Sequence, residues 1–253
     1  AAFEKAGFKN AVVVKVQADD ADFDTLDVNV ASVRWITNAQ PMFGAIGPSQ
    51  VDPRTGEILD ADISFESLSS RALRHFKAQV IASGGGSDAE WAKLMQLPSV
   101  TSRHAAEACE HADHAAEQLG YALDALDLDP ASPEAEQFVL DYMVDVTMHE
   151  VGHTLGLRHN FRSSKIYTDQ QVSDRDFTAK NGLAGSVMEY APINLPRGRE
   201  TGGMPFQKVL GPYDYWAIEY GYKPIASAQE AAELKKIAAR SGEPVRPVRQ
   251  QCE

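Results

Sequence analysis

The sequence contains few cysteines, and this limits the covalent chemistry to consider. Among its 253 residues only Cys109 and Cys252 carry a thiol, and they form no C-x-x-C arrangement. They could form one disulfide in an oxidising compartment, or they could be two unrelated thiols. The sequence leaves both alternatives open.

Basic clusters and long apolar runs are also missing. Acidic residues outnumber basic ones 36 to 24, the formal net charge is −12, and no run of Lys or Arg is longer than a dipeptide. Such a surface repels polyanions, so we expect no nucleic-acid partner. Apolar runs such as "AVVVKV" are far shorter than the roughly 20 residues that cross a bilayer, so we expect no membrane insertion of this segment.

The composition suits a globular chain, with 43% hydrophobic and 24% charged residues. A chain of this size can bury one sizeable core, or two lobes that share a cleft. It begins "AAFEKAGF", without an initiator Met and with a helical pattern. We therefore expect part of a longer polypeptide or a processed form, with any export signal outside the given chain.

The N-terminal part predicts alternating helices and strands: a helix at 2–9 and strands at "NAVVVKV" (10–16) and "SVRWIT" (32–37). Between the strands, Asp20, Asp22 and Asp24 have the early spacing of a calcium loop. The later Gly and Glu of such a loop are missing, so a solvated acidic loop is favoured and Ca²⁺ stays a weaker hypothesis.

Residues 45–66 predict a β-hairpin. In its second strand Leu59, Ala61, Ile63 and Phe65 alternate with polar residues, so one face should be buried and the other exposed. "DPRTG" supplies the turn, and the Gly- and Pro-containing segment before it suits an irregular edge strand.

Three helices are predicted next, at about 67–82, 88–97 and 102–120, within an insert at about 67–130. The third carries His104, His111 and His114 among alanines and glutamates. His111 and His114 could bind a metal as helical neighbours, but an exposed polar helix face explains the same pattern and is favoured.

A long helix should begin at Ser132 and Pro133, which are typical of the N-cap and first helical positions. Apolar residues lie on two of its faces, so we expect burial almost all round. It leads into "HEVGHTLGLRHN", residues 149–160, which contains three histidines, a glutamate and two glycines.

Helical geometry divides this motif into parts. His149 and His153 project from one side, roughly 6 Å apart along the axis, so both imidazoles can reach one ion. On a continued helix His159 would lie roughly 240° from His153 and face away. Gly156 can adopt the left-handed conformation that ends a helix, which could return His159 as a third ligand. Glu150 borders the same surface.

Three imidazoles suit Zn²⁺. A structural zinc site is normally closed by a fourth protein ligand, so three histidines leave a position for a hydrolytic water. We therefore predict one catalytic zinc ion held by His149, His153 and His159. A single histidine of this kind would more often be a satisfied core residue, but the complete H-E-x-x-H-x-x-G-x-x-H pattern favours the metal site.

The motif resembles that of metzincin metalloproteases, a resemblance that spans most of the chain. "SVMEY" at 186–190 is similar to the family's methionine-containing turn, with Met188 as the matching methionine about 30 residues after His159. "TGEILDADI" is similar to a matrixin strand, which implies that residues 43–51 align the substrate. The combination looks closest to a bacterial family of long, exported zinc-dependent metalloproteases with a matrixin- or astacin-like catalytic domain.

The resemblance implies an α+β, α/β/α-like fold: a small twisted mixed sheet with an antiparallel edge strand, a long active-site helix, and a mostly helical and loop C-terminal subdomain. Residues 1–253 would form one catalytic domain, with an upper subdomain at 1–157 and a lower one at 158–253. Helices at 211–222 and 227–242, the latter capped, would complete the lower subdomain.

The implied activity is hydrolysis of internal peptide bonds in a peptide or protein substrate. A zinc-activated water would attack the carbonyl, and Glu150 would act as general base and then general acid. The hydroxyl of Tyr190, matching an astacin- and serralysin-like position, is a candidate to stabilise the oxyanion. The resemblance also implies export to the periplasm or the extracellular space.

Two other functions stay open. The chain could be a zinc-stabilised binding or scaffold domain that cleaves nothing, or the same site could serve an exopeptidase or an amidase. Substrate specificity would depend on residues 183–205, whose folded shape the sequence does not predict.

Overall fold

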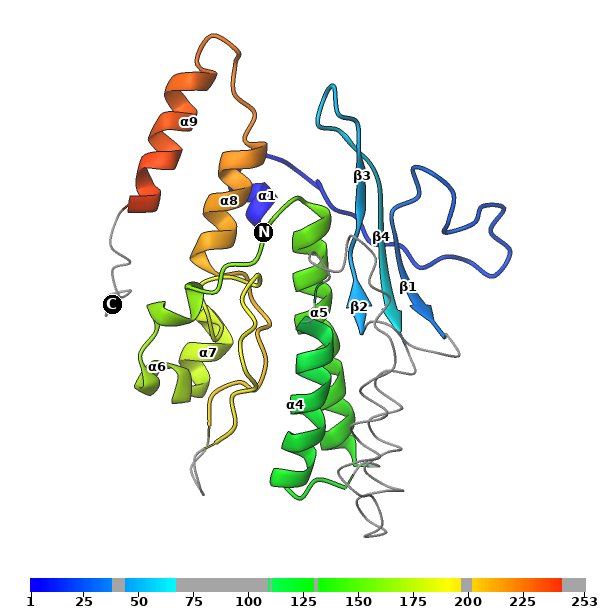
Figure 1. The fold of residues 1–253 in the computed structure, drawn as a ribbon, viewed down its shortest axis with the longest axis vertical. Coiled ribbons are helices and arrows are strands. Elements are labelled where there is room, and N and C mark those ends of the chain that lie inside the picture. The colour runs from blue at the N-terminus through cyan, green and yellow to red at the C-terminus, as the bar shows by residue number, and fades with distance from the viewer. Residues whose placement is uncertain (38–43, 67–108, 110, 130–131, 197–201, 243–253) are drawn as a thin grey trace, which may run out of the picture. The chain divides into compact units, whose positions relative to one another are not determined.

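A computed structural model describes residues 1–37, 44–66, 109, 111–129, 132–196 and 202–242 (Figure 1). The helices predicted at 67–82 and 88–97, and Cys252, lie outside these residues. The chain divides into two compact units. We call residues 23–156 the sheet unit, and residues 1–22 with 157–253 the C-terminal unit. The prediction of a single catalytic domain with subdomains at 1–157 and 158–253 stays a prediction.

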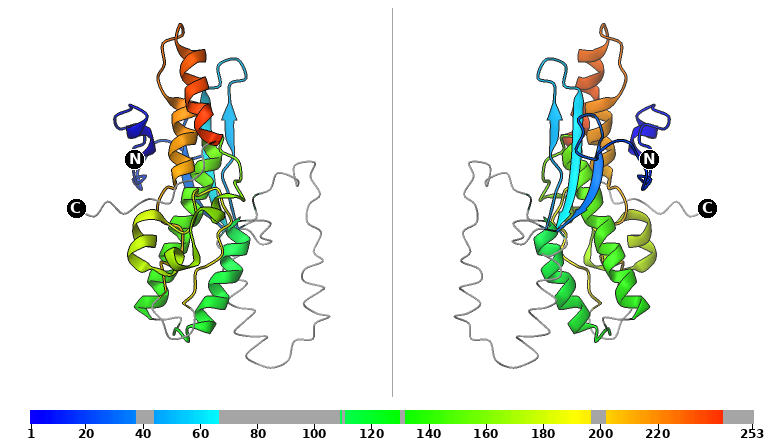
Figure 2. Two further views of the ribbon diagram at one scale, coloured as in Figure 1. Left: turned by 90° about the vertical axis from the view of Figure 1, so that its left-hand side faces the viewer. Right: turned by 90° about the vertical axis from the view of Figure 1, so that its right-hand side faces the viewer.

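The sheet unit contains a small open mixed sheet. β4 (Ile58–Glu66) is its central strand; β1 (Ser32–Ile36) pairs with it in parallel, and β2 (Ala45–Ile46) and β3 (Ser49–Val51) pair with it antiparallel (Figures 1 and 2). The strand at 32–37, the hairpin at 45–66 and the irregular antiparallel edge are therefore confirmed.

Burial along β4 differs from simple alternation. Ile63 and Phe65 are buried as predicted, but Leu59 is 38% exposed, and Ser64 and Glu66 on the opposite face are buried. The final residues of β4 are thus covered on both faces. This is the end of the strand that pairs with β2, where Ala45 lies opposite Phe65.

Residues 10–16 contradict the prediction of a buried strand. No strand forms there, and Val12, Val13, Val14 and Val16 are 65–95% exposed. β-branched residues favour a strand only when a sheet edge receives them, and this segment pairs with none in the described structure. The helix predicted at 2–9 is confirmed only as α1 (Ala2–Lys5), which ends before Gly7 in its left-handed conformation.

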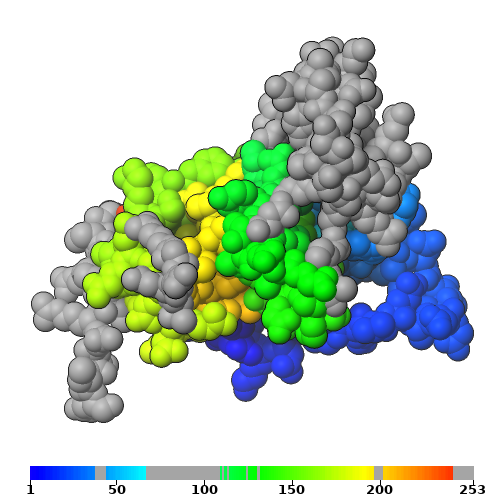
Figure 3. Space-filling view, turned by 90° about the horizontal axis from the view of Figure 1, so that it is seen from below, coloured from blue at the N-terminus to red at the C-terminus, as the bar shows by residue number. Residues whose placement is uncertain are grey.

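Two helices complete the sheet unit. α4 (His111–Ala125) and α5 (Pro133–Thr154) lie side by side, in green in Figures 1 and 3. The Tyr142 hydroxyl of α5 donates a hydrogen bond to the carbonyl oxygen of Ala112 in α4, 3.2 Å away. α5 begins as predicted, because the Ala135 N–H donates to the Ser132 hydroxyl at 3.1 Å.

The prediction that this long helix is buried almost all round is wrong. Leu140 and Val144 are 48% and 43% exposed, whereas Asp141 and Asp145 are buried. The helix therefore turns a polar face toward its neighbours. Among the described helices, none is long and apolar enough to cross a membrane.

The C-terminal unit is built from short helices and ordered turns. They are η3 (Ser163–Ile166), α6 (Asp169–Ser173), α7 (Arg175–Asn181), α8 (Pro212–Tyr222), α9 (Glu230–Ala239) and η4 (Arg240–Gly242). α1 packs against α8, with the Phe3 and Tyr222 ring centroids 5.2 Å apart. The Trp216 indole N–H of α8 donates to the Ile237 carbonyl of α9 at 2.8 Å. The two predicted C-terminal helices are confirmed, although Gln229 gives α9 no side-chain cap.

Together these elements form the predicted α+β architecture, with a small mixed sheet, a long helix and a mostly helical and loop C-terminal part.

Candidate metal centre

The last two turns of α5 carry the first half of the predicted motif. His149 is completely buried and His153 is partly exposed, and their ring centroids lie 4.8 Å apart at an interplanar angle of 81°. The helix ends at Thr154, and Gly156 adopts a left-handed φ of +80°. Its N–H donates to the His153 carbonyl at 2.8 Å. The predicted role of Gly156 in ending the helix is confirmed.

A cysteine that the sequence did not assign to this site lies beside the histidines. The Sγ atom of Cys109 is 3.3 Å from Nε2 of His149, and the Cys109 side chain is buried. Within the sheet unit, the ligand atoms of Cys109, His149 and His153 all lie within 4.8 Å of one another. Such a set of nitrogen and sulfur donors could hold a metal ion.

Glu150 is the carboxylate nearest in sequence to these ligands, and it is completely buried. Neither of its carboxylate oxygens makes a hydrogen bond of normal geometry among the described residues. Burial raises the pKa of Glu150 to about 7, while the Cys109 thiol, the charge of His111 and the Gly47 N–H act in the opposite direction. A carboxylate in this state can exchange protons near neutral pH.

The edge of the sheet approaches Glu150 through a glycine. A Cβ atom added to Gly47, between β2 and β3, would lie 2.6 Å from the Glu150 carbonyl oxygen and 3.0 Å from its Oε2. Glycine is therefore required at this position. The segment predicted to align substrate, of which residues 44–51 are described, thus passes directly beside the predicted general base.

His111 supports the site from α4, where an exposed residue was expected. It is only 2% exposed, and its ring stacks on that of His149 with centroids 4.3 Å apart. Its Nε2 lies 3.7 Å from Oδ1 of Asp145, which is also buried. The favoured interpretation of an exposed polar face is therefore wrong for His111, whereas His114 is exposed as expected. His104 lies outside the described residues.

The turn that contains Met188 is tied to the start of α8. Asp214 accepts hydrogen bonds from the Ser186 hydroxyl (2.6 Å), the Val187 N–H (3.0 Å) and the Gly211 N–H (2.8 Å). Met188 is completely buried. Burial raises the pKa of Asp214, although these three hydrogen bonds oppose the rise.

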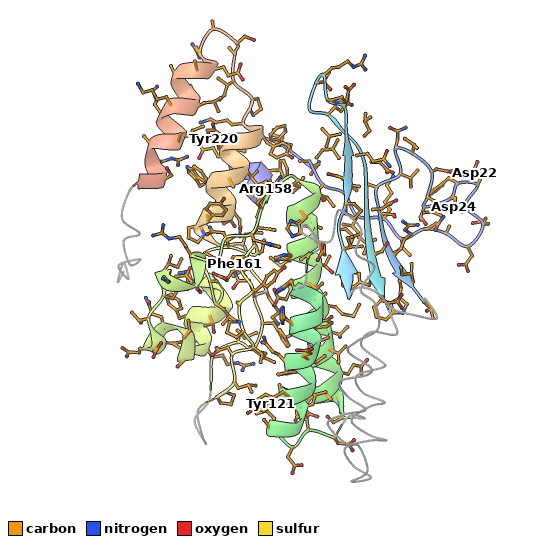
Figure 4. The ribbon with its side chains drawn as sticks, in the orientation of Figure 1. Asp22, Asp24, Tyr121, Arg158, Phe161 and Tyr220 are labelled. Atoms are coloured by element: carbon orange, nitrogen blue, oxygen red, sulfur yellow. The ribbon has the colours of Figure 1, made fainter. Side chains whose placement is uncertain are left out.

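The same turn is connected to the chain that follows the motif. The Asn160 N–H donates to the Met188 carbonyl at 2.9 Å, and the rings of His159 and Tyr190 lie edge to face with centroids 4.7 Å apart. Phe161, labelled in Figure 4, packs against both rings. Within the C-terminal unit, His159, Met188 and Tyr190 therefore form one connected cluster.

Glu189, the residue between Met188 and Tyr190, has a structural role. Its side chain accepts hydrogen bonds from the Ser164 N–H at 2.9 Å and the Ser163 hydroxyl at 3.3 Å, at the start of η3. An acidic side chain at the N-terminus of a helical turn satisfies donors that would otherwise lack partners.

Residues 131–246 match the family model described as Met-zincin. This match supports a metzincin-type fold and, with the Cys/His group, indicates a zinc metallopeptidase. No curated protein and no solved structure matches the chain.

The residues present fit a zinc ion. Imidazole nitrogen and thiolate sulfur are its preferred ligands, and a tetrahedral site with ordinary bond lengths holds them about 3.3–3.8 Å apart. The 3.3 Å between Cys109 and His149 already falls in this range. The Glu150 carboxylate is buried and lacks a normal hydrogen bond, as expected of a catalytic group whose partner is the reactant.

The acidic loop gives no comparable group. Asp24 and Asp27 turn their carboxylates onto the loop itself, since Asp24 accepts from the Leu26 N–H and Asp27 accepts from the Asp24 N–H. Figure 4 labels Asp22 and Asp24 on this exposed segment. Within the part of the chain that the structure describes, only the Cys/His group brings together three or more metal-ligating side chains.

Proposed function

We propose that this domain is a zinc-dependent endopeptidase that hydrolyses internal peptide bonds. The observation that carries the proposal is the placement of Glu150: a buried carboxylate with a raised pKa, on the same helical turn as two metal-ligating histidines. A structural metal site has no use for such a group. The Met-zincin match supports the same class of activity.

His149, His153 and His159 would hold the metal. When bound, Zn²⁺ supplies Lewis-acid chemistry: it polarises the scissile carbonyl and makes the attacking water more acidic. Glu150 takes one proton from that water onto its carboxylate and later delivers it to the departing amine nitrogen. Its pKa of about 7 lets it accept and release the proton at neutral pH without a large energetic cost in either direction.

Two residues of the C-terminal unit complete the proposal. The Tyr190 hydroxyl donates a hydrogen bond to the carbonyl oxygen as negative charge develops on it. Met188 would provide an apolar floor for the metal site. The backbone of residues 44–51 aligns the peptide as an added strand, which gives main-chain recognition independent of the side chains.

We also propose that the domain acts within a longer, exported polypeptide, as in the bacterial metalloproteases that its motifs resemble. Its substrate would be a peptide or a protein.

The test is cleavage of a mixed peptide library by metal-replete protein, with products identified by mass spectrometry. Wild type and Cys109→Ser are both assayed, because Cys109 lies against His149. We expect cuts at internal bonds that a chelator abolishes and added Zn²⁺ restores. Removal of single terminal residues would instead identify an exopeptidase. If neither protein cleaves any peptide, the domain is a zinc-stabilised scaffold and the proposal is wrong.

A further inference from the structure

We propose that an exposed surface of the C-terminal unit selects acidic peptides that carry an apolar side chain. This surface, called here the aromatic–basic surface, consists of Phe161, Arg158, Arg162 and Lys165. Two observations carry the inference: Phe161 is exposed while it contacts His159 and Tyr190, and the segment around it is basic. The inference rests on the proposed peptidase activity and adds its substrate class.

Phe161 is exposed although its ring belongs to an aromatic cluster. Its ring centroid lies 5.3 Å from that of His159 and 5.2 Å from that of Tyr190, yet 57% of the residue is exposed. The phenyl ring therefore contacts a proposed metal ligand and the candidate for the oxyanion, and still presents apolar area to solvent. An apolar side chain of a peptide that packs on this area removes apolar surface of both partners from water.

A hydrogen-bonded turn presents Phe161 and Arg162. The Ser163 N–H donates to the Asn160 carbonyl at 3.1 Å, so Phe161 and Arg162 occupy the two central positions of the turn. The Asn160 N–H in turn donates to the Met188 carbonyl at 2.9 Å, which holds the turn beside the buried methionine. The surface is thus ordered before a peptide arrives, and this lowers the entropic cost of binding.

The segment is locally basic in an acidic chain. Residues 151–168 contain three basic residues and no Asp or Glu, whereas the whole chain has a formal net charge of −12. Arg158, Arg162 and Lys165 are exposed, and within the described part of the chain none of them forms an ion pair. Exposed charges more than about 8 Å apart are largely screened at physiological ionic strength, so a bound peptide responds mainly to these cations.

The cations lie on both sides of Phe161 in the chain. Lys165 follows Arg162 by three residues, and its N–H donates to the Arg162 carbonyl at 3.3 Å at the start of η3. Residues three apart in such a turn eclipse one another, so these two cations share one side of it. Arg158 precedes His159, and Figure 4 labels it together with Phe161. Carboxylates that flank an apolar residue of a peptide can therefore pair with these cations.

The test compares matched peptides of equal length. Three carry a central leucine flanked by glutamates, glutamines or lysines, and a fourth has alanine in place of the leucine between glutamates. The whole, zinc-loaded chain is assayed for kcat/KM. Exposed ion pairs contribute about 1.5- to 5-fold each, so we expect glutamate to be favoured over glutamine about tenfold, and lysine to be least favoured. Added salt should reduce this preference.

Two triple variants test the charges. The charge variant replaces all three cations of the aromatic–basic surface by alanine. Its control replaces three other exposed lysines of the same unit by alanine: Lys9, Lys15 and Lys235. Both variants lose three positive charges, so they have the same net charge. The charge variant should lose the preference for glutamate, and the control should keep it.

Phe161→Ala and Phe161→Leu test the apolar contact. One methylene in a hydrophobic pocket changes specificity by about tenfold or more, so on one exposed ring we expect leucine to be favoured over alanine about tenfold. Phe161→Ala should bring this ratio close to one, and Phe161→Leu should retain part of it. Tyr220→Ala is the control, because Tyr220 is 44% exposed and stacks on Trp216. A merely structural role of Phe161 would lower kcat/KM for all peptides and leave the ratio unchanged.

Binding is the second readout, and it does not depend on turnover. The same substitutions are made in Glu150→Gln protein, and fluorescence anisotropy of the labelled peptides gives Kd. We expect the peptide with leucine between glutamates to bind most tightly, and the charge variant and Phe161→Ala to lose this selectivity.

The outcomes separate the two proposals. Cleavage with the same preferences in wild type, the charge variant and Phe161→Ala would overturn the role of the surface and leave the peptidase proposal standing. If nothing is cleaved but binding is selective as expected, the peptidase proposal is wrong, while selection of acidic peptides by this surface is supported. Absence of both cleavage and selective binding would overturn both proposals.

Discussion

Replacement of Asp214 by alanine should destabilise the protein through the turn that contains Met188. The Asp214 carboxylate is 1% exposed and accepts three hydrogen bonds, from the Ser186 hydroxyl and from the N–H groups of Val187 and Gly211. Alanine would leave these donors buried without an acceptor. At about 1 kcal/mol for each hydrogen bond, we expect the free energy of unfolding to fall by about 3 kcal/mol.

The loss can be measured in two ways. For a chain of this size, about 3 kcal/mol corresponds to a decrease in Tm of about 6–12 °C in a thermal scan. Denaturant unfolding should show a lower midpoint with an unchanged slope, because the folded structure stays the same. Both measurements are made at constant zinc, since bound metal also stabilises the folded state.

Two variants control for the change of charge and of side chain. Asp214→Asn keeps an oxygen that can accept from the backbone donors, so its loss should be smaller, about 1 kcal/mol. Glu233→Ala removes a partly exposed carboxylate that pairs with Lys236, and it should change stability much less than Asp214→Ala, because ion pairs at the surface contribute little. If Asp214→Ala were as stable as Glu233→Ala, the hydrogen bonds of Asp214 would not hold this turn, and the reasoning would be refuted.

Three further predictions concern the site and its supports. Gly47→Ala should lower kcat/KM and reduce the free energy of unfolding by about 1–3 kcal/mol, because the added Cβ would clash with Glu150. Gly221→Ala is the control, because open space surrounds Gly221. Equal effects of the two substitutions would contradict the close approach of Gly47 to Glu150. Gly156→Ala should lower the free energy of unfolding by about 1–2 kcal/mol and weaken zinc binding, because alanine disfavours a φ of +80°. Gly156→Asn should have a smaller effect, because asparagine adopts this φ more readily. An unchanged zinc affinity in Gly156→Ala would argue against a role for this bend. Burial raises the pKa of Asp214 above its ordinary 3.8, so the folded state binds this proton more tightly than the unfolded chain does. The stability of wild type relative to Asp214→Asn should therefore be greatest below pH 3.8 and fall as pH rises through the raised pKa. A stability difference that does not change with pH in denaturant titrations would contradict this.

The features that the sequence predicted best depend on local chemistry. Ser132 and Pro133 start α5 because their side chains suit the first turn of any helix. Gly156 follows the end of α5 because its left-handed φ disfavours most other residues. The hairpin at 45–66 depends on turn residues and alternation within one segment. The spacing of His149 and His153 is set by the helix itself, so their proximity needs no knowledge of the rest of the fold.

The features that the sequence did not predict depend on contacts between distant segments. Cys109 lies 40 residues before His149, and only the packing of α4 on α5 brings it to the site. His111 lies in a sequence pattern typical of an exposed helix face, but at the start of α4 its ring stacks on the ring of His149. The predicted strand at 10–16 is wrong because the β-propensity of its valines is a local property, and in the described structure no sheet edge pairs with this segment.

The central claim is that Glu150 performs the proton transfers at a metal-dependent peptidase site, and Glu150→Gln tests it most directly. The variant is compared with its parent, either wild type or Cys109→Ser, whichever is more active. We predict that Glu150→Gln binds zinc at the same stoichiometry and loses about 10²–10⁴-fold in kcat/KM toward a peptide cleaved by the parent, the scale of general acid–base catalysis. Near-parental kcat/KM at equal zinc content would contradict the account.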